Sequence, residues 1–80
     1  MENINEKISV LVCFGDGEKL RPYRFKWGGR VFNIKDVTYS WIDTLGSAKI
    51  YHFAVTDGNT VFELGFNSLS MDWRLERTDV

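Results

Sequence analysis

Residues 20–34 have the sequence LRPYRFKWGGRVFNI, in which two segments with alternating apolar residues flank the pair Gly28-Gly29. Such a pair accepts the positive φ angles that a two-residue type I′ or II′ hairpin turn requires. The turn fixes the register of three cross-strand pairs, which are Trp27–Arg30, Phe25–Phe32 and Tyr23–Ile34. Because side chains alternate between faces, all of these share one face, and all but Arg30 are large and apolar. Turn chemistry and hydrophobic pattern therefore predict one hairpin, with Tyr23 and Phe25 in the core.

The segments on either side also have strand character. Lys7 to Phe14 (KISVLVCF) is apolar on both faces, which predicts a strand covered twice, with Cys13 as a small core hydrophobe. At Lys35-Asp36 the apolar alternation changes from even to odd positions, so we expect a β-bulge or sharp bend there.

A second hairpin is predicted at Asp57-Gly58, again as a two-residue turn. Its register would pair Val55–Thr60, Phe53–Phe62 and Tyr51–Leu64, and on the other face His52–Glu63. A four-residue loop over 67–70 would then pair Phe66–Met71, Leu64–Trp73 and Phe62–Leu75. Both hairpins give a coherent apolar face.

These segments predict an all-β fold of about six antiparallel strands in a meander, forming a strongly twisted sheet or a small SH3-like barrel. The 80 residues make one domain, 1–80, with residues 1–5 and 79–80 as the candidates for disorder. The chain has one cysteine, no signal-peptide pattern and no apolar run of membrane-spanning length, so we expect a cytoplasmic protein.

The spacing P-x-x-F-x-W-x-G-R-V-F-x-I from Pro22, followed by Trp41, the segment VFEL at 61–64 and W-x-L at Trp73, resembles a known family. Its members are small uncharacterised bacterial all-β domains, free-standing or near the C-terminus of some Y-family DNA-polymerase-like proteins. The resemblance covers about residues 20–77. It implies an all-β fold and a DNA-related setting, and it brings no catalytic residues with it.

Catalytic and metal chemistry lack support in the sequence. One His and one Cys cannot supply a four-ligand zinc site, and the acidic residues do not have the spacing of a calcium-binding loop. A Cys13–His52 dyad would need a shared cleft, whereas Cys13 is expected in an apolar strand and His52 in an exposed pair with Glu63. We therefore expect a non-enzymatic protein without metal or cofactor.

Binding is the remaining class of function, and it has two candidate surfaces. The first is a protein interface or homodimer formed by the aromatic residues Tyr39, Trp41 and Trp73.

The second is nucleic-acid backbone binding through a basic stretch, with Trp27 partly exposed and stacked under Arg30. Its residues are Lys19, Arg21, Arg24, Lys26, Trp27, Arg30 and Lys35. Residues 19–30 carry five basic side chains and no acid, whereas the rest of the chain has five basic and eleven acidic ones. The protein-interaction module is the leading hypothesis and nucleic-acid binding the alternative.

Overall fold

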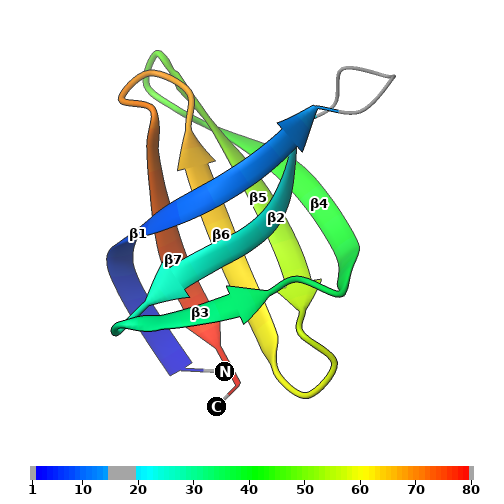
Figure 1. The fold of residues 1–80 in the computed structure, drawn as a ribbon. Coiled ribbons are helices and arrows are strands. Elements are labelled where there is room, and N and C mark those ends of the chain that lie inside the picture. The colour runs from blue at the N-terminus through cyan, green and yellow to red at the C-terminus, as the bar shows by residue number, and fades with distance from the viewer. Residues whose placement is uncertain (1, 15–19, 80) are drawn as a thin grey trace.

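Seven antiparallel strands curl into a half-barrel in the computed structural model, which describes residues 2–14 and 20–79 (Figure 1). The strands are β1 (Glu2–Phe14), β2 (Leu20–Trp27), β3 (Arg30–Asn33), β4 (Asp36–Leu45), β5 (Ala48–Thr56), β6 (Val61–Asn67) and β7 (Asp72–Thr78). Their order across the sheet is β3-β2-β1-β7-β6-β5-β4. The predicted all-β meander is confirmed, and β1 joins its two halves by pairing with both β2 and β7.

The first hairpin has the predicted turn and register. Gly28 and Gly29 have φ angles of 59° and 79°, both in the left-handed region that a type I′ turn requires. Phe25 lies opposite Phe32, with their rings stacked at a centroid distance of 5.1 Å. The two-residue turn therefore sets which side chains meet.

The prediction that Tyr23 lies in the core is wrong. Between β1 and β2 the register changes from Leu11–Arg24 to Val12–Pro22, which leaves Tyr23 as the extra residue of a β-bulge. Pro22 has no N–H to donate to a sheet ladder, and proline within a sheet is confined to edges and bulges. Pro22 is fully buried while Tyr23 is 49% exposed. The bulge therefore turns the Tyr23 ring from the inside of the sheet to its outer face.

The predicted break at Lys35-Asp36 is present, and it separates β3 from β4 at residues 34–35. This accounts for seven strands rather than six. A second irregularity follows inside β4, where the register moves from Val37–Val55 to Tyr39–Ala54. As a result, Val37 packs against the core whereas Tyr39 is exposed.

The second half of the chain has the predicted faces but not the predicted pairs. Observed pairs are Val55–Phe62, Phe53–Leu64, Tyr51–Phe66, Leu64–Leu75 and Phe66–Trp73. Each predicted register is off by two residues, a shift that keeps every side chain on its face. Between β5 and β6 the cause is turn length: the Asp57 carboxylate accepts the backbone N–H groups of Asn59 (2.9 Å) and Thr60 (2.8 Å), which builds a longer turn than Asp57-Gly58 alone. Between β6 and β7 the connecting residues are 68–71 rather than 67–70, because Asn67 pairs with Asp72.

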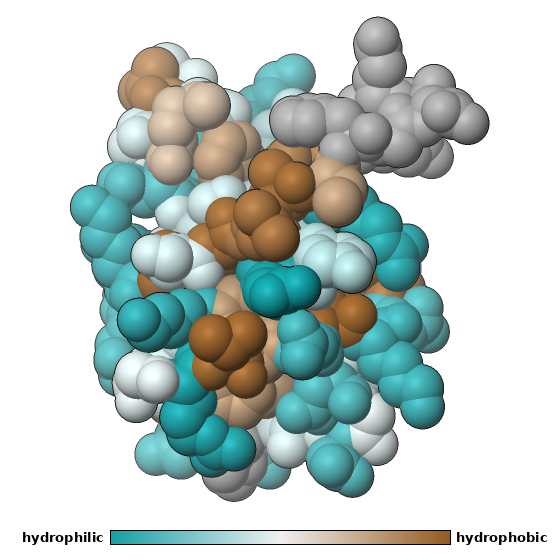
Figure 2. Space-filling model, in the orientation of Figure 1, coloured by the Kyte–Doolittle hydropathy of each residue, from teal (hydrophilic) through white to brown (hydrophobic). Residues whose placement is uncertain are grey.

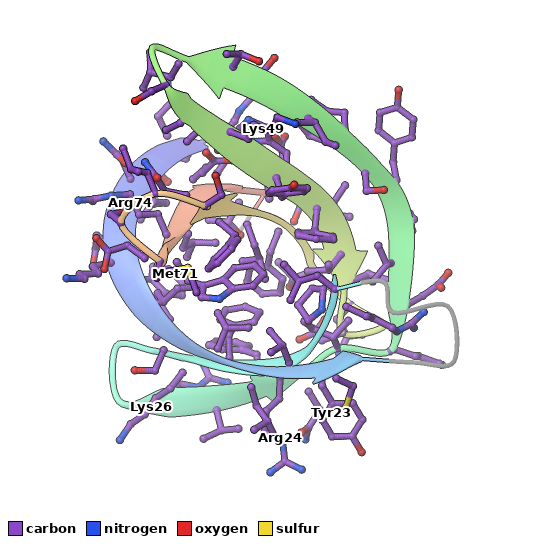
Figure 3. The ribbon with its side chains drawn as sticks, turned by 90° about the horizontal axis from the view of Figure 1, so that it is seen from above. Tyr23, Arg24, Lys26, Lys49, Met71 and Arg74 are labelled. Atoms are coloured by element: carbon purple, nitrogen blue, oxygen red, sulfur yellow. The ribbon has the colours of Figure 1, made fainter. Side chains whose placement is uncertain are left out.

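One core fills the inside of the half-barrel (Figure 3). Its buried members are Phe25, Phe53, Val55, Phe62, Leu64, Trp73 and Leu75. Ile8, Val10 and Val12 of β1 pack against it, whereas Leu11 and Cys13 are exposed, so β1 is covered on one face and not two. Among the expected candidates for disorder, 1–5 and 79–80, residues 2–5 form the first part of β1, and Asp79 accepts the backbone N–H of Val61, whereas residues 1 and 80 lie outside the described residues. No helix in the described part of the chain has the length and apolarity to cross a membrane.

Candidate nucleic-acid interface

Three cations form a ladder on the outer side of β2. Arg21, Arg24 and Lys26 lie opposite Cys13, Leu11 and Ser9, which are alternate residues of β1 and so share its outer face. Arg21 and Arg24 are three positions apart and would normally point to opposite sides. The bulge at Tyr23 supplies the extra residue that brings both to the outside.

We call this surface the cationic face. It consists of the outward side chains Ser9, Leu11 and Cys13 of β1, Arg21, Tyr23, Arg24 and Lys26 of β2, and Val31 and Asn33 of β3. Figure 3 shows Tyr23, Arg24 and Lys26 pointing outward, away from the inside of the half-barrel. Figure 2 shows apolar and hydrophilic side chains interleaved on the side of the molecule where β1, β2 and β3 lie.

Within the part of the chain that the structure describes, no acidic side chain neutralises the charge of this surface. Residues 7–14 and 20–33 contain no Asp or Glu. Among the described residues, Arg24 and Lys26 make no ion pair, whereas Lys7 is held by Asp72 at 3.2 Å. Lys7 in turn lowers the pKa of the Asp72 carboxyl by hydrogen bonding to it. Residues 36–79 carry Lys49, Arg74 and Arg77 against seven acids, so the cations of the face lie on one side of an otherwise acidic molecule.

An aromatic ring lies within this surface. The guanidinium carbon of Arg24 lies 5.4 Å from the centroid of the Tyr23 ring, in cation–π geometry. Beside them runs a shallow groove of about 290 Å³, lined in part by Leu11, Lys26 and Val31. The surface therefore combines an exposed ring and exposed apolar side chains with cations that have no ion-pair partner in the described segments.

The remaining residues of the predicted basic site lie elsewhere. Arg30 faces the other side of the hairpin, where its guanidinium covers the Phe32 ring at 5.1 Å rather than that of Trp27. Trp27 is half-buried, and its indole N–H donates to Glu6 at 3.3 Å. Lys35 lies at the Asp57–Thr60 turn, where its side chain borders Gly58. Lys19 lies outside the described residues.

The three aromatic residues predicted at a protein interface also separate. Trp73 is buried and packs against Phe66, with a centroid distance of 4.9 Å, so it contributes to the core and not to the surface. Tyr39 and Trp41 lie on the outer side of β4, with ring centroids 5.4 Å apart. Of the three predicted interface residues, Tyr39 and Trp41 are therefore the two that a partner could contact.

His52 does not pair with Glu63, contrary to prediction, because the register places Gly65 opposite it and Ala54 opposite Glu63. Glu76 reaches across Gly65, and its Oε1 lies 2.7 Å from His52 Nδ1. Asp43 Oδ2 lies 3.0 Å from Nε2 without the geometry of a hydrogen bond.

The Trp41 ring stacks on the imidazole of His52 at 4.9 Å and 9°. This arrangement ties β4, β5 and β7 together over the glycine of β6. Within the described residues, no group of three or more His, Cys, Asp or Glu side chains is arranged to hold a metal ion.

Sequence reasoning missed the exposure of Leu11, Cys13 and Tyr23. A signal for the last was present, because a proline inside a strand pattern predicts a bulge and hence a change of face. No feature of the sequence indicated that the outer face of β1, with Leu11 and Cys13, is uncovered.

Comparison of the chain with family models, with curated proteins and with solved structures gives no match in any of the three.

Proposed function

We propose that the protein binds single-stranded nucleic acid through the cationic face. The observation that carries this proposal is the Arg21–Arg24–Lys26 ladder with the exposed Tyr23 ring inside it. Single-strand binders combine basic side chains that follow the phosphate backbone with aromatic rings on which bases stack.

The spacing of the ladder supports backbone contact. Residues two apart on a strand are separated by about 6.8 Å, so Arg24 and Lys26 can each hold a separate phosphate of an extended strand. A guanidinium also donates to phosphate in a bidentate manner. Because neither side chain has an ion pair among the described residues, binding breaks no existing salt bridge.

The environment of Tyr23 favours a single strand over a duplex. In a duplex the bases are stacked on each other, and an exposed ring on a sheet surface cannot reach their faces. An unpaired base can instead stack on Tyr23 while its phosphates lie along β2, at a gain of about 1–3 kcal/mol per base. The groove beside Leu11 and Val31 offers apolar contact for the same base.

Fluorescence anisotropy with labelled single-stranded DNA, single-stranded RNA and duplex DNA tests this. With three phosphate contacts, the plot of log affinity against log salt concentration should have a slope of about −2 for single strands. Arg24→Gln or Lys26→Gln should each reduce the magnitude of that slope by about 0.7. Tyr23→Ala should weaken binding about tenfold or more without changing the slope.

Lys49→Gln is the matched control, because Lys49 is an exposed cation on the opposite side of the half-barrel (Figure 3). It should leave affinity and slope unchanged. Absence of binding to all three oligonucleotides at about 50 mM salt, where phosphate contacts are strong, would overturn the proposal. So would an effect of Lys49→Gln as large as that of Arg24→Gln. Binding of polyglutamate in place of oligonucleotides would assign the face to an acidic protein partner.

A further inference from the structure

The edge strand β4 presents a long unpaired side. It pairs with β5 along one side, and it is the last strand of the sheet, so none of the described strands pairs with the other. Its exposed apolar side chains are Tyr39 (66%), Ile42 (58%) and Leu45 (69%). An exposed apolar edge of this kind is a template for pairing with another strand.

The direction of the free backbone groups follows from the turn that ends β4. Gly46 has a φ of 62° at the first central position, as a type II′ turn requires, so Leu45 and Ala48 form the hydrogen-bonded closing pair. From Leu45 to Tyr39 the ladder has no bulge, and bonded pairs alternate with non-bonded ones. The N–H and C=O groups of Ser40, Ile42 and Thr44 therefore point away from β5.

We propose that this edge pairs with the β4 strand of a second copy of the chain, antiparallel about a two-fold axis at Ile42. The axis places Ile42 opposite Ile42 of the second copy. It places Tyr39 opposite the other copy's Leu45, and this contact occurs twice. All three exposed apolar side chains of β4 thus meet an exposed apolar side chain. The outward N–H and C=O groups of Ser40, Ile42 and Thr44 fall opposite those of Thr44, Ile42 and Ser40 of the second copy.

The apolar side chains of β4 favour this register over a shifted one. With the axis at Ile42, Asp43 lies opposite Trp41 of the other copy, and Asp36 lies outside the paired segment 39–45. Moving the axis to the neighbouring outward residue Ser40 would place Ile42 opposite Thr38 and leave Leu45 with no apolar residue opposite it.

The other sheet edge, β3, has four residues and carries Arg30. Of the two sheet edges, β4 is the one whose exposed apolar side chains match one another in an antiparallel pair. For this reason the proposed partner strand is the β4 of a second copy. The proposal is independent of nucleic-acid binding, because the cationic face lies on β1 to β3.

Analytical ultracentrifugation from micromolar to millimolar protein tests the dimer. The parent chain should show a concentration-dependent monomer–dimer equilibrium. Ile42→Lys should weaken association about a hundredfold, because two ammonium groups would face each other at the axis. Leu69→Lys is the control, since Leu69 is likewise an exposed apolar residue, in the turn after β6, and it should leave association unchanged. Far-UV circular dichroism verifies that each variant is folded.

Two further measurements test the register. Tyr39→Lys and Leu45→Glu should each be monomeric, and their mixture should form a heterodimer in which Lys and Glu face each other. Hydrogen exchange should show the amides of Ser40, Ile42 and Thr44 slowing as concentration rises, while those of Trp41 and Asp43 stay protected throughout.

A monomer over the whole concentration range would overturn the proposal. A dimer that persists unchanged in Ile42→Lys would also overturn it, since the interface would then lie elsewhere.

Discussion

His52 and Glu76 lie 24 positions apart in the chain, yet Oε1 of Glu76 lies 2.7 Å from Nδ1 of His52. They belong to β5 and β7, with β6 between them. The contact is possible because β6 has Gly65 at this point, and the Glu76 side chain passes over it: a Cβ at that position would overlap the carboxylate. The imidazole is only 12% exposed, so the contact is largely shielded from solvent.

Gly65→Ala should therefore break the contact between β5 and β7. The methyl group displaces the flexible carboxylate, and loss of a hydrogen bond to a charged group lowers the free energy of unfolding by about 1.5–3 kcal/mol. Chemical denaturation measures this loss. In a Glu76→Ala background the carboxylate is absent, so Gly65→Ala should then cost less than about 0.5 kcal/mol, because the two sites are coupled. Equal costs of Gly65→Ala in both backgrounds would contradict this account.

Tyr23 and Phe25 provide a test of the bulge. Tyr23→Ala should change the free energy of unfolding by less than about 0.5 kcal/mol, because the ring lies outside the core. Phe25→Ala should cost about 3–5 kcal/mol, because that ring packs against Phe32 and Phe62. The alternation predicted from the sequence requires both to be costly, so urea denaturation of the two variants separates the two arrangements.

Asp57 should give the protein a pH-dependent stability. The N–H groups of Thr60 and Asn59 hold the pKa of this carboxyl below its ordinary value. Because the folded pKa is lowered, the stabilising contribution is fully present above the unfolded pKa of about 4. It is lost as pH falls from there through the folded pKa.

Denaturation of the parent chain and of Asp57→Asn as a function of pH measures the effect. Asparagine keeps an acceptor oxygen but has no charge, so the difference in unfolding free energy should be constant above about pH 5 and shrink at lower pH. A difference that does not change with pH would contradict the charge-based explanation.

Cys13 should react with a neutral alkylating reagent in the folded protein, since its side chain is exposed on the cationic face. The expected rate is close to that of the unfolded chain, measured by mass spectrometry. A bound single strand should slow the reaction by covering the thiol, which connects this measurement to the proposed function. A thiol that reacts only after unfolding would place Cys13 in the core.

Much of the fold follows from short-range chemistry that the sequence contains. Gly28-Gly29 specifies a two-residue hairpin turn, which the structure shows to be of type I′, and the turn specifies the Phe25–Phe32 pair, so register and apolar face are determined within the hairpin itself. The faces of β5, β6 and β7 follow from a period of two, which no shift by two residues can disturb. The pairs within those strands do not follow: Asp57 builds a longer turn between β5 and β6 by accepting two backbone N–H groups, and the loop between β6 and β7 begins one residue later than predicted.

The candidate sites depended on the tertiary structure. The sequence by itself determined an all-β chain, its first turn and a cluster of cations near that turn. The partner strand decided which cations share a surface: pairing with β1 requires a bulge beside Pro22, and that bulge places Arg21, Tyr23 and Arg24 on one face. The order of the strands likewise left β4 at an edge, and the pairing of β6 with both β5 and β7 brought Glu76 to His52 across Gly65. These outcomes involve residues far apart in the chain, and local alternation carries no information about which strand lies beside which.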